Sequence, residues 1–466
     1  MYNVGHIDLW EVALLKVTLI YPRFQTPMAG GLEEPLGILY IAAVLRELGH
    51  QVRFFDLSYA HHLEVMDEGL RDADWIGMSS TSALFGKALA VLAYVKRIAP
   101  DVPTVIGGPH ATIMPEEVLR AGFDYAVLGE GERTIAEFVK LFAQGRANEC
   151  PGVACLEDGR LRLNPRLDFI EDLDTVPFPA RDLLDYTHYP TIGMIASRGC
   201  PFRCLYCKPM VDNLFGKRVR HRSPANVVDD LERALSIAGH KDIYFKDDTL
   251  TVLKMEWFEE FGAELKRRGL SIRWQANSRV DTVTYEKLKL MRDTGCTQLS
   301  FGVESGSPRV LEFYRKHTDP EQAVRAFRWC HELGILPHAF LMLGAPEETA
   351  EDMQMTYDLV KRIKPRSWTV YTTTAFPGND LYDYAVEHDL LNVTSYEDYD
   401  NAQNSLLGRS PLKLKYITPD DVKRYRDKIN HYLFFINLFN PRVIRKALRR
   451  PGAALRKARN VLFTSG

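Results

Sequence analysis

Cysteine is scarce in this chain, and what else it lacks excludes several broad classes of protein. Its 466 residues include only 7 cysteines, an odd and sparse number that argues against a secreted scaffold held by disulfides. No run of 18 or more apolar residues occurs, so we expect no transmembrane helix. The formal net charge of −2 argues against a nucleic-acid partner. Asp8 and Glu11 stand where a secretion signal carries positive charge, so we expect a cytoplasmic protein.

The first 145 residues alternate short apolar runs with helical patterns, which is typical of a parallel α/β sheet. The expected strands are 17–21, 52–57, 75–79, 104–107 and 125–128. Five strands with four crossover helices predict a doubly wound, Rossmann-like sheet that binds a ligand beyond the carboxyl ends of its strands. The loops at those ends do not contain G-x-G-x-x-G, which disfavours a dinucleotide ligand.

Small and hydroxyl-bearing residues gather at the same predicted edge. Small residues let a ligand approach the backbone, and hydroxyl groups supply hydrogen bonds. The candidate contacts are Ser79, Ser80, Thr81, Gly107, Gly108, His110, Thr112, Gly129, Glu130 and Gly131.

Beyond this domain (1–145), the sequence predicts a linker, a second α/β domain and a helical end. Residues 146–190 are rich in proline and lack a sustained period, which indicates a linker. Residues 191–385 predict a partial (β/α)6, TIM-like barrel. Its expected strands are 192–196, 243–245, 272–276, 298–302, 337–343 and 368–373. Residues 386–466 are predicted to be a helical C-terminal region with a basic tail.

The second domain opens with the most specific motif of the chain. Cys200, Cys204 and Cys207 have C-x3-C-x2-C spacing and directly follow its first strand. Three thiolates can hold three irons of a [4Fe–4S] cluster, whereas a closed cluster takes four. The open position that remains on the fourth iron is typical of a catalytic metal. A zinc site would need a further ligand, and His221 is 14 residues beyond Cys207.

This spacing, with Tyr206 before the last cysteine, resembles the radical S-adenosylmethionine (SAM) superfamily. The preceding GGPHAT and GEGE segments are similar to those of the cobalamin-binding domain in its class B members. The resemblance implies three cofactors: a [4Fe–4S] cluster bound by the cysteines, SAM, and cobalamin at the edge of the first sheet. A D-x-H-x-x-G motif is absent, so no histidine is expected on cobalt.

The resemblance also assigns SAM contacts to the ends of the barrel strands. These are Tyr206, Asp247, Asp248, Gln275, Arg279, Glu304, Ser305, Gly344 and Pro346. The sequence departs from the family pattern at Glu347, in LGAPEET, and at Asn379 and Asp380, in AFPGND.

Reductive cleavage of SAM to a 5′-deoxyadenosyl radical is the activity that the resemblance implies, with methyl transfer to an unactivated carbon as the leading hypothesis. Oxidative cyclisation or rearrangement, as in anaerobic magnesium-protoporphyrin cyclases, is the alternative, and a non-catalytic cobalamin or metal sensor is a third. The expected partners are a small-molecule substrate, such as a lipid or tetrapyrrole, and an electron donor such as flavodoxin or ferredoxin.

The last 36 residues, from His431, contain eight Lys or Arg and no Asp or Glu. Such a segment predicts either peripheral contact with an anionic membrane at the inner surface or a helix docked on the barrel with a solvated basic face.

Overall fold

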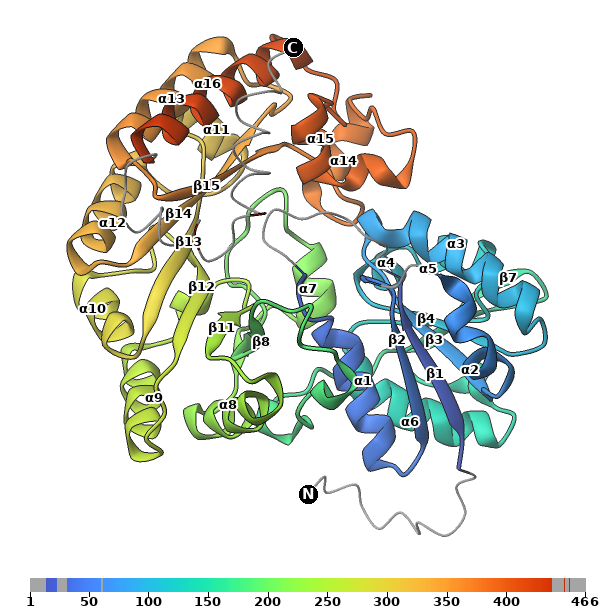
Figure 1. Cartoon of the computed structure of the whole chain (residues 1–466). Helices are drawn as coiled ribbons and strands as arrows, with labels where there is room; N and C mark the ends of the chain where they lie inside the picture. Colours follow the sequence, from blue (N-terminus) through green and yellow to red (C-terminus); the bar gives the residue numbers. More distant parts are fainter. Residues whose placement is uncertain (1–13, 23–31, 60–61, 438–447, 449–451, 453–466) are drawn as a thin grey trace.

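The computed structural model describes residues 14–22, 32–59 and 62–437, together with 448 and 452. They form two α/β units, each built around its own sheet, in the order that the sequence predicts (Figure 1). A C-terminal region of helices lies beside both units.

The first unit is a seven-stranded sheet with the strand order β2-β1-β3-β4-β5-β6-β7. Its strands are β1 (Lys16–Tyr21), β2 (Gln51–Asp56), β3 (Trp75–Ser79), β4 (Thr104–Gly107), β5 (Tyr125–Val127), β6 (Val153–Glu157) and β7 (Arg160–Leu163). The first five pair in parallel. The order reverses between β1 and β3, and α/β sheets bind ligands outside the carboxyl ends of the strands at such a point.

Helices cover both faces of this sheet, which confirms the doubly wound arrangement. They are α1 (Leu36–Glu47), α2 (Asp67–Arg71), α3 (Ser82–Ile98), α4 (Pro109–Ile113), α5 (Pro115–Arg120) and α6 (Gly131–Ala143). Apolar side chains of α1 and α6 form the core on one face, and those of α2, α3 and α5 form the core on the other.

The hairpin of β6 and β7 lies where the sequence predicts a linker. It pairs antiparallel with β5, so the first sheet extends beyond residue 145. The turn is Asp158-Gly159, with φ values of 48° and 73°. An Asp-Gly pair between two alternating runs is a strong hairpin signal, because both turn positions need a positive φ. The linker proper therefore starts after Leu163.

The second unit is a six-stranded parallel sheet with the order β15-β14-β13-β12-β11-β8. Its strands are β8 (Ile192–Met194), β11 (Asp242–Phe245), β12 (Arg273–Arg279), β13 (Cys296–Glu304), β14 (Leu336–Leu343) and β15 (Ser367–Thr372). Within the described residues, the end strands β8 and β15 do not pair with each other. The sheet is thus the half-open barrel that the sequence predicts.

Helices cover the outside of this barrel (Figure 1). Helix α11 (Pro308–Phe313) follows β13 and belongs to a separate cluster, in which Val310 packs with Ala345. The covering helices are α8 (Pro224–Ala238), α9 (Met255–Arg267), α10 (Tyr285–Asp293), α12 (Pro320–Leu333) and α13 (Ala350–Ile363). Side chains alternate along each strand. On β12, Trp274 and Ala276 are buried in the core that these helices share, whereas Gln275 and Asn277 are only partly buried on the opposite face. The inner face of the barrel is therefore the more polar one here.

The C-terminal region comprises α14 (Asp380–Glu387), α15 (Asn401–Leu407) and α16 (Pro419–Asn437). Helix α16 packs on α13 and buries Ile429 and Leu433 in the barrel core. A short turn returns to the first unit, where the ring of Tyr396 lies 4.9 Å from that of Phe85. Most of the predicted basic tail lies outside the described residues. None of the helices that the structure describes has the length and apolarity needed to cross a membrane.

Candidate active site

The cysteine loop lies at the carboxyl end of the barrel sheet, where β/α barrels place their active sites. Cys204 is buried, and Cys200 and Cys207 are partly exposed. The backbone N–H groups of Cys207 and Lys208 both donate to the carbonyl of Cys204, at 3.0 Å each. Burial, followed by the neighbouring thiol of Cys204, raises the pKa of Cys207, and Cys200 adds to this effect. The three thiols therefore lie close together in one tight turn.

Such a turn suits a cluster better than a single metal ion. In the part of the chain that the structure describes, no group of three His, Cys, Asp or Glu side chains could hold one metal ion. A cubane needs no such convergence, because each thiolate binds a different iron. Three neighbouring thiols of unequal exposure on one loop fit that requirement.

The loop that follows β15 holds the cysteine loop from one side. The side-chain amide of Asn379 donates to the carbonyl of Tyr206 at 2.9 Å, and the backbone N–H of Asp380 donates to the carbonyl of Lys208 at 2.6 Å. The two residues at which the sequence departs from the family turn are thus residues that fix the cysteine loop. The sequence alone carries no signal for this contact.

Arg279, at the end of β12, contacts another part of the same loop. Its Nη1 lies 3.3 Å from Sγ of Cys204, and its guanidinium carbon lies 3.7 Å from the ring centroid of Phe202. Its remaining donors bind the Asp281 carboxylate at 2.9 Å and the Lys316 carbonyl at 2.7 Å. Arg279, which the resemblance assigns as a SAM contact, is thus 4% exposed and engaged by protein groups.

Tyr206 and Glu304, both predicted to contact SAM, are hydrogen-bonded to each other. The Tyr206 hydroxyl donates to Oε1 of Glu304 at 3.2 Å, and Lys316 pairs with the same oxygen at 2.8 Å. A Cβ on Gly302 would lie 2.5 Å from that oxygen and 2.7 Å from Nζ of Lys316, so a larger residue there would displace the pair. Burial and then the charge of Glu304 raise the pKa of Tyr206. This triad adjoins the cysteine loop.

The two aspartates after β11 are placed differently. Asp247 is 2% exposed, and its carboxylate accepts hydrogen bonds from the Ser197 hydroxyl at 2.5 Å and from the Ala196 N–H at 3.2 Å. Burial raises its pKa to about 6. Asp248 is exposed, and its charge adds to burial in raising the pKa of Cys200. Asp247 thus braces the start of the loop, and Asp248 is the carboxylate left open near it.

Gln275 and Ser305 also differ in what they can reach. Gln275 lies partly exposed on the inner face of β12. Ser305 is fully buried, and its hydroxyl lies 3.0 Å from that of Thr356. Gln275 is accessible to a ligand in the barrel, whereas Ser305 shapes the turn after β13.

The turn after β14 closes around a buried carboxyl group. The N–H groups of Gly344 and Ala345 donate to Oε2 of Glu348, at 2.6 and 3.1 Å, while its Oε1 has no hydrogen-bond partner among the described residues. Burial raises the pKa of Glu348 to about 8. Pro346 is buried in the same turn. The N–H of Gly344 is thus bound to Glu348, and the carbonyl of Pro346 accepts from the N–H of Lys415 at 3.1 Å.

At the edge of the first sheet, the structure brings together the loops after β3 and β4. Gly108 has φ +91°, and a Cβ there would lie 2.9 Å from both Oγ of Ser79 and the carbonyl of Ser80. Gly107 is partly exposed, and a Cβ there would come no closer than 3.8 Å to its nearest neighbour, Val127. Thr81 is exposed beyond them. Backbone and hydroxyl groups are therefore accessible along this edge.

The loop after β5 joins the same edge. The Thr112 hydroxyl donates to the carbonyl of Gly108 at 2.9 Å and accepts from the N–H of Gly129 at 2.9 Å. Gly131 begins α6, and a Cβ there would lie 2.8 Å from the Ile41 side chain of α1. A larger residue at position 131 would require the end of the Ile41 side chain to move, while Gly129 remains at the edge.

His110 does not reach this edge with its side chain. It is 1% exposed, its Nδ1 lies 3.1 Å from the Ser82 hydroxyl, and its ring packs 4.1 Å from that of Phe85. Burial lowers its pKa to about 4, so the ring is neutral at physiological pH. The imidazole is a packing group between α3 and the C-terminal region, beside Tyr396.

Glu130 is drawn into the interface between the two units. Its carboxylate pairs with Arg198 at 3.0 Å and with Arg220 at 2.8 Å, both from the second unit. A second buried network links the units through Arg181, which contacts Glu34 at 3.3 Å and also pairs with Asp230. Neither network could be expected from the sequence, because the partners are far apart along the chain.

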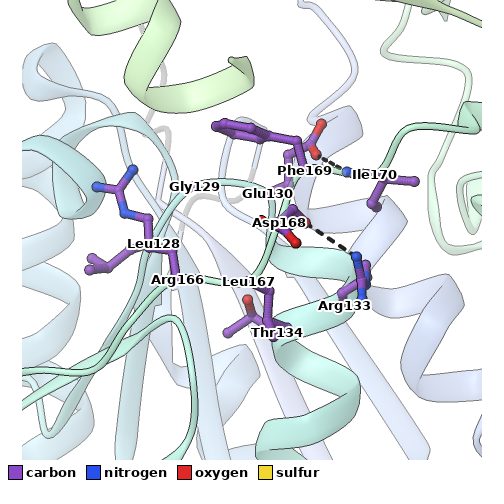
Figure 2. Close-up of a pocket in the computed structure, with 10 residues that line it drawn as sticks. All are labelled: Leu128, Gly129, Glu130, Arg133, Thr134, Arg166, Leu167, Asp168, Phe169 and Ile170. Carbon is purple, nitrogen blue, oxygen red and sulfur yellow. Dashed lines mark hydrogen bonds between the residues drawn. The ribbon is translucent and has the colours of Figure 1, made fainter.

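A small cavity lies beside Glu130, between the loop that starts α6 and residues 166–170 (Figure 2). Its volume of about 10 Å³ is room for roughly one water molecule. It is far too small for a cofactor and is separate from the barrel mouth, so it does not mark the active site.

Comparison with known proteins assigns both units. Residues 194–360 match the family model of the radical SAM superfamily, and residues 28–139 match that of the B12 binding domain. The chain is 31% identical over 440 residues to the uncharacterized methyltransferase PH0819 of Pyrococcus horikoshii, covering 90% of this chain and 93% of the relative. The chain belongs to the cobalamin-dependent radical SAM family.

Other members of the family differ in reaction. The chain is also 31% identical to the anaerobic magnesium-protoporphyrin IX monomethyl ester cyclase of Rubrivivax gelatinosus, over 83% of this chain and 72% of that protein. The fold matches the radical SAM methyltransferase TsrM of Kitasatospora setae with a TM-score of 0.68 at 19% identity, covering 81% of this chain and 75% of that one.

Family membership confirms the predicted enzyme class and cofactors: a radical SAM enzyme with a [4Fe–4S] cluster, SAM and cobalamin. The residues present suit these groups in type. The cysteine loop offers three adjacent thiols, and the edge after β3 and β4 offers accessible backbone and hydroxyl groups to the amide-rich periphery of a corrinoid. The individual contact residues stay predictions.

Proposed function

We propose that this enzyme transfers a methyl group to an unactivated carbon of a small-molecule substrate. The observation that carries the proposal is the position of the first sheet's carboxyl edge against the cysteine loop. Helix α4, after β4, packs on α7 (Met210–Phe215), which directly follows the loop. Arg166 spans the same gap, donating to the carbonyls of Asn213 at 2.8 Å and Thr112 at 3.4 Å. A methyl carrier at this edge would face the barrel mouth.

The protein's own residues bind and orient the cluster and SAM in this proposal. Cys200, Cys204 and Cys207 are the cluster ligands in this proposal. Asp248 is the carboxylate best placed to accept from the amino group of SAM, because Asp247 is already engaged by Ser197. When bound, the cofactors supply one-electron cleavage of SAM and a methyl group on cobalt.

Other inward-facing groups orient the remainder of SAM. Tyr206, Glu304 and Gln275 lie on the barrel's inner side, where hydroxyl, carboxylate and amide groups can bind the polar parts of the cofactor. At the first edge, Ser79, Gly107, Gly108 and Gly129 are the proposed cobalamin contacts. His110 is not part of the proposal, because its side chain is 1% exposed.

Oxidative cyclisation is the second candidate, favoured by the likeness to the Rubrivivax gelatinosus cyclase. That relative makes a tetrapyrrole a candidate substrate here.

The proposal also includes flavodoxin or ferredoxin as the electron donor and contact of the basic tail with an anionic membrane. Both rest on the sequence alone.

The test is anaerobic reconstitution with iron, sulfide and hydroxocobalamin, followed by assay with SAM and a reductant. Formation of 5′-deoxyadenosine together with S-adenosylhomocysteine supports methyl transfer. Deoxyadenosine without S-adenosylhomocysteine, with turnover of magnesium-protoporphyrin monomethyl ester as probe, supports cyclisation. If neither product forms while the cluster is intact, both candidates are wrong. Cys204→Ala is the matched control, because it removes one cluster ligand.

A further inference from the structure

Glu130 occupies the loop between β5 and α6, in the GEGE segment, and its carboxylate contacts the second unit. Figure 2 shows its carboxylate beside the backbone of Ile170. Oε2 accepts from the N–H of Ile170 at 2.9 Å and from Nη1 of Arg220 at 2.9 Å. Oε1 accepts from Arg198 at 3.0 Å and from Nη2 of Arg220 at 2.8 Å. Both oxygens are thus occupied by protein donors.

The arginines that bind Glu130 carry the start of the cysteine loop. Arg198 lies in β9 (Ser197–Arg198), a short strand that ends two residues before Cys200. Arg220 lies in β10 (Arg220–His221), which pairs with β9. Arg198 also pairs with Glu132 at 2.5 Å. Glu130 and Glu132 therefore bind β9, the strand that directly precedes the cysteine loop.

The backbone between Arg198 and Cys200 has little conformational freedom. Gly199 has φ +92°, and a Cβ there would lie 2.8 Å from the carbonyl of Arg218. On the other flank, Asp247 holds Ser197. A shift of the loop after β5 therefore moves Cys200 as well, because the intervening residues 197–199 cannot change conformation to compensate.

Burial strengthens the ion pairs that Glu130 and Glu132 form with Arg198 and Arg220. The side chains of Glu130, Glu132, Arg198 and Arg220 are all less than 10% exposed. Charges removed from water are stable only when paired and hydrogen-bonded, so the loss of one partner is costly. Burial acts against the ionised form of Glu130, but the hydrogen bond from Arg220 and the charge of Arg198 outweigh it and lower the pKa of Glu130.

We infer that Glu130 is a positioning residue that fixes the cysteine loop on the loop after β5, and not a cobalamin contact. With Arg198 and Arg220 it sets the distance between the two cofactor sites. The inference rests on the family's shared cofactors and holds for methyl transfer and cyclisation alike.

Glu130→Gln is the main test, because it keeps the size and acceptor oxygen while removing the charge. Arg220→Lys and the double variant complete a cycle, and Glu149→Gln is the matched control, since Glu149 forms an exposed ion pair with Arg146 in the same unit. Three quantities are measured on the full chain: the Kd for hydroxocobalamin, deoxyadenosine formation per intact cluster, and amide exchange of residues 196–199.

We expect E130Q and R220K each to speed amide exchange at residues 196–199 and to slow deoxyadenosine formation per cluster by about 10- to 100-fold, because small misplacements of reacting groups have effects of that size. The double variant should be no slower than the single ones. Cobalamin Kd should stay within about twofold of wild type, and E149Q should match wild type throughout.

Two results would overturn the inference. One is a rise in cobalamin Kd of about tenfold or more in E130Q but not in R220K, with unchanged exchange, which would make Glu130 a cofactor contact. The other is wild-type exchange and rate in both variants. Neither measurement depends on methyl transfer, so a wrong reaction assignment and a wrong role for Glu130 give different patterns.

Discussion

Glu348→Gln should remove a loss of stability that the wild-type enzyme undergoes as the pH rises from about 5 to about 8. Glu348 is fully buried, its Oε2 accepts two backbone N–H groups, and burial raises its pKa from 4.5 to about 8. A carboxyl group whose pKa is higher in the folded state stabilises the fold below its unfolded pKa. That contribution is lost as the pH rises through the folded value.

The size of the effect follows from the pKa difference. Each unit corresponds to about 1.4 kcal/mol, so the contribution of Glu348 falls by about 4 kcal/mol between pH 5 and pH 8. Glutamine keeps the acceptor for Gly344 and Ala345 and cannot ionise. Relative to wild type, E348Q should therefore gain stability steadily over this range. For a domain of 150–250 residues, the gain corresponds to roughly 8–16 °C in Tm.

The assay is the unfolding temperature of wild type and E348Q without cofactors, under anaerobic conditions from pH 5 to pH 9. Glu347→Gln is the neighbouring control, because the ion pair of Glu347 with Lys415 lowers the pKa of this carboxyl group. The difference in unfolding temperature between E347Q and wild type should be almost constant above pH 6. A difference between E348Q and wild type that does not change with pH would refute the assignment of Glu348 as a protonated buried acid.

Three further changes test the site. Cys204→Ala should abolish the cluster, read as lost iron and sulfide content, together with all deoxyadenosine formation; retained activity would exclude the cysteine loop as its holder. Gly108→Ala should destabilise the first unit by about 1–3 kcal/mol, because φ +91° is nearly restricted to glycine and the new Cβ would meet Ser79. Denaturant unfolding measures this loss, and no change would contradict the tight turn. Arg279→Lys should lower the reduction potential of the cluster, because hydrogen bonds to its sulfurs raise that potential and lysine cannot reproduce the forked contact. An unchanged potential in a redox titration would show that Arg279 does not act on Cys204.

Local patterns predicted the fold well, because each strand and helix is encoded by neighbouring residues. The parallel strands of both sheets and the position of the cysteine loop after β8 could be predicted in this way. The β6–β7 hairpin was also encoded locally, in Asp158-Gly159, although the surrounding prolines favoured a linker.

Roles that depend on distant partners could not be predicted. Arg279 meets Cys204 across 75 residues, and Glu130 meets Arg198 and Arg220 across 68 and 90 residues. A charged residue at a strand end has the same local signature whether it binds a cofactor or another part of the protein. Only the fold shows that these side chains already have partners.

The half-open barrel also has an exposed strand to protect. β8 ends the sheet, so one side of its backbone has no neighbour among the described strands, and such edges promote association between molecules. Here the N–H of Gly193 donates to Glu34 at 2.9 Å, and its carbonyl accepts from Arg181 at 2.6 Å. The first unit and the linker thus take the place of a missing strand. A barrel produced without them would expose this edge and should aggregate, so covering the edge is a structural role of the N-terminal unit and the linker.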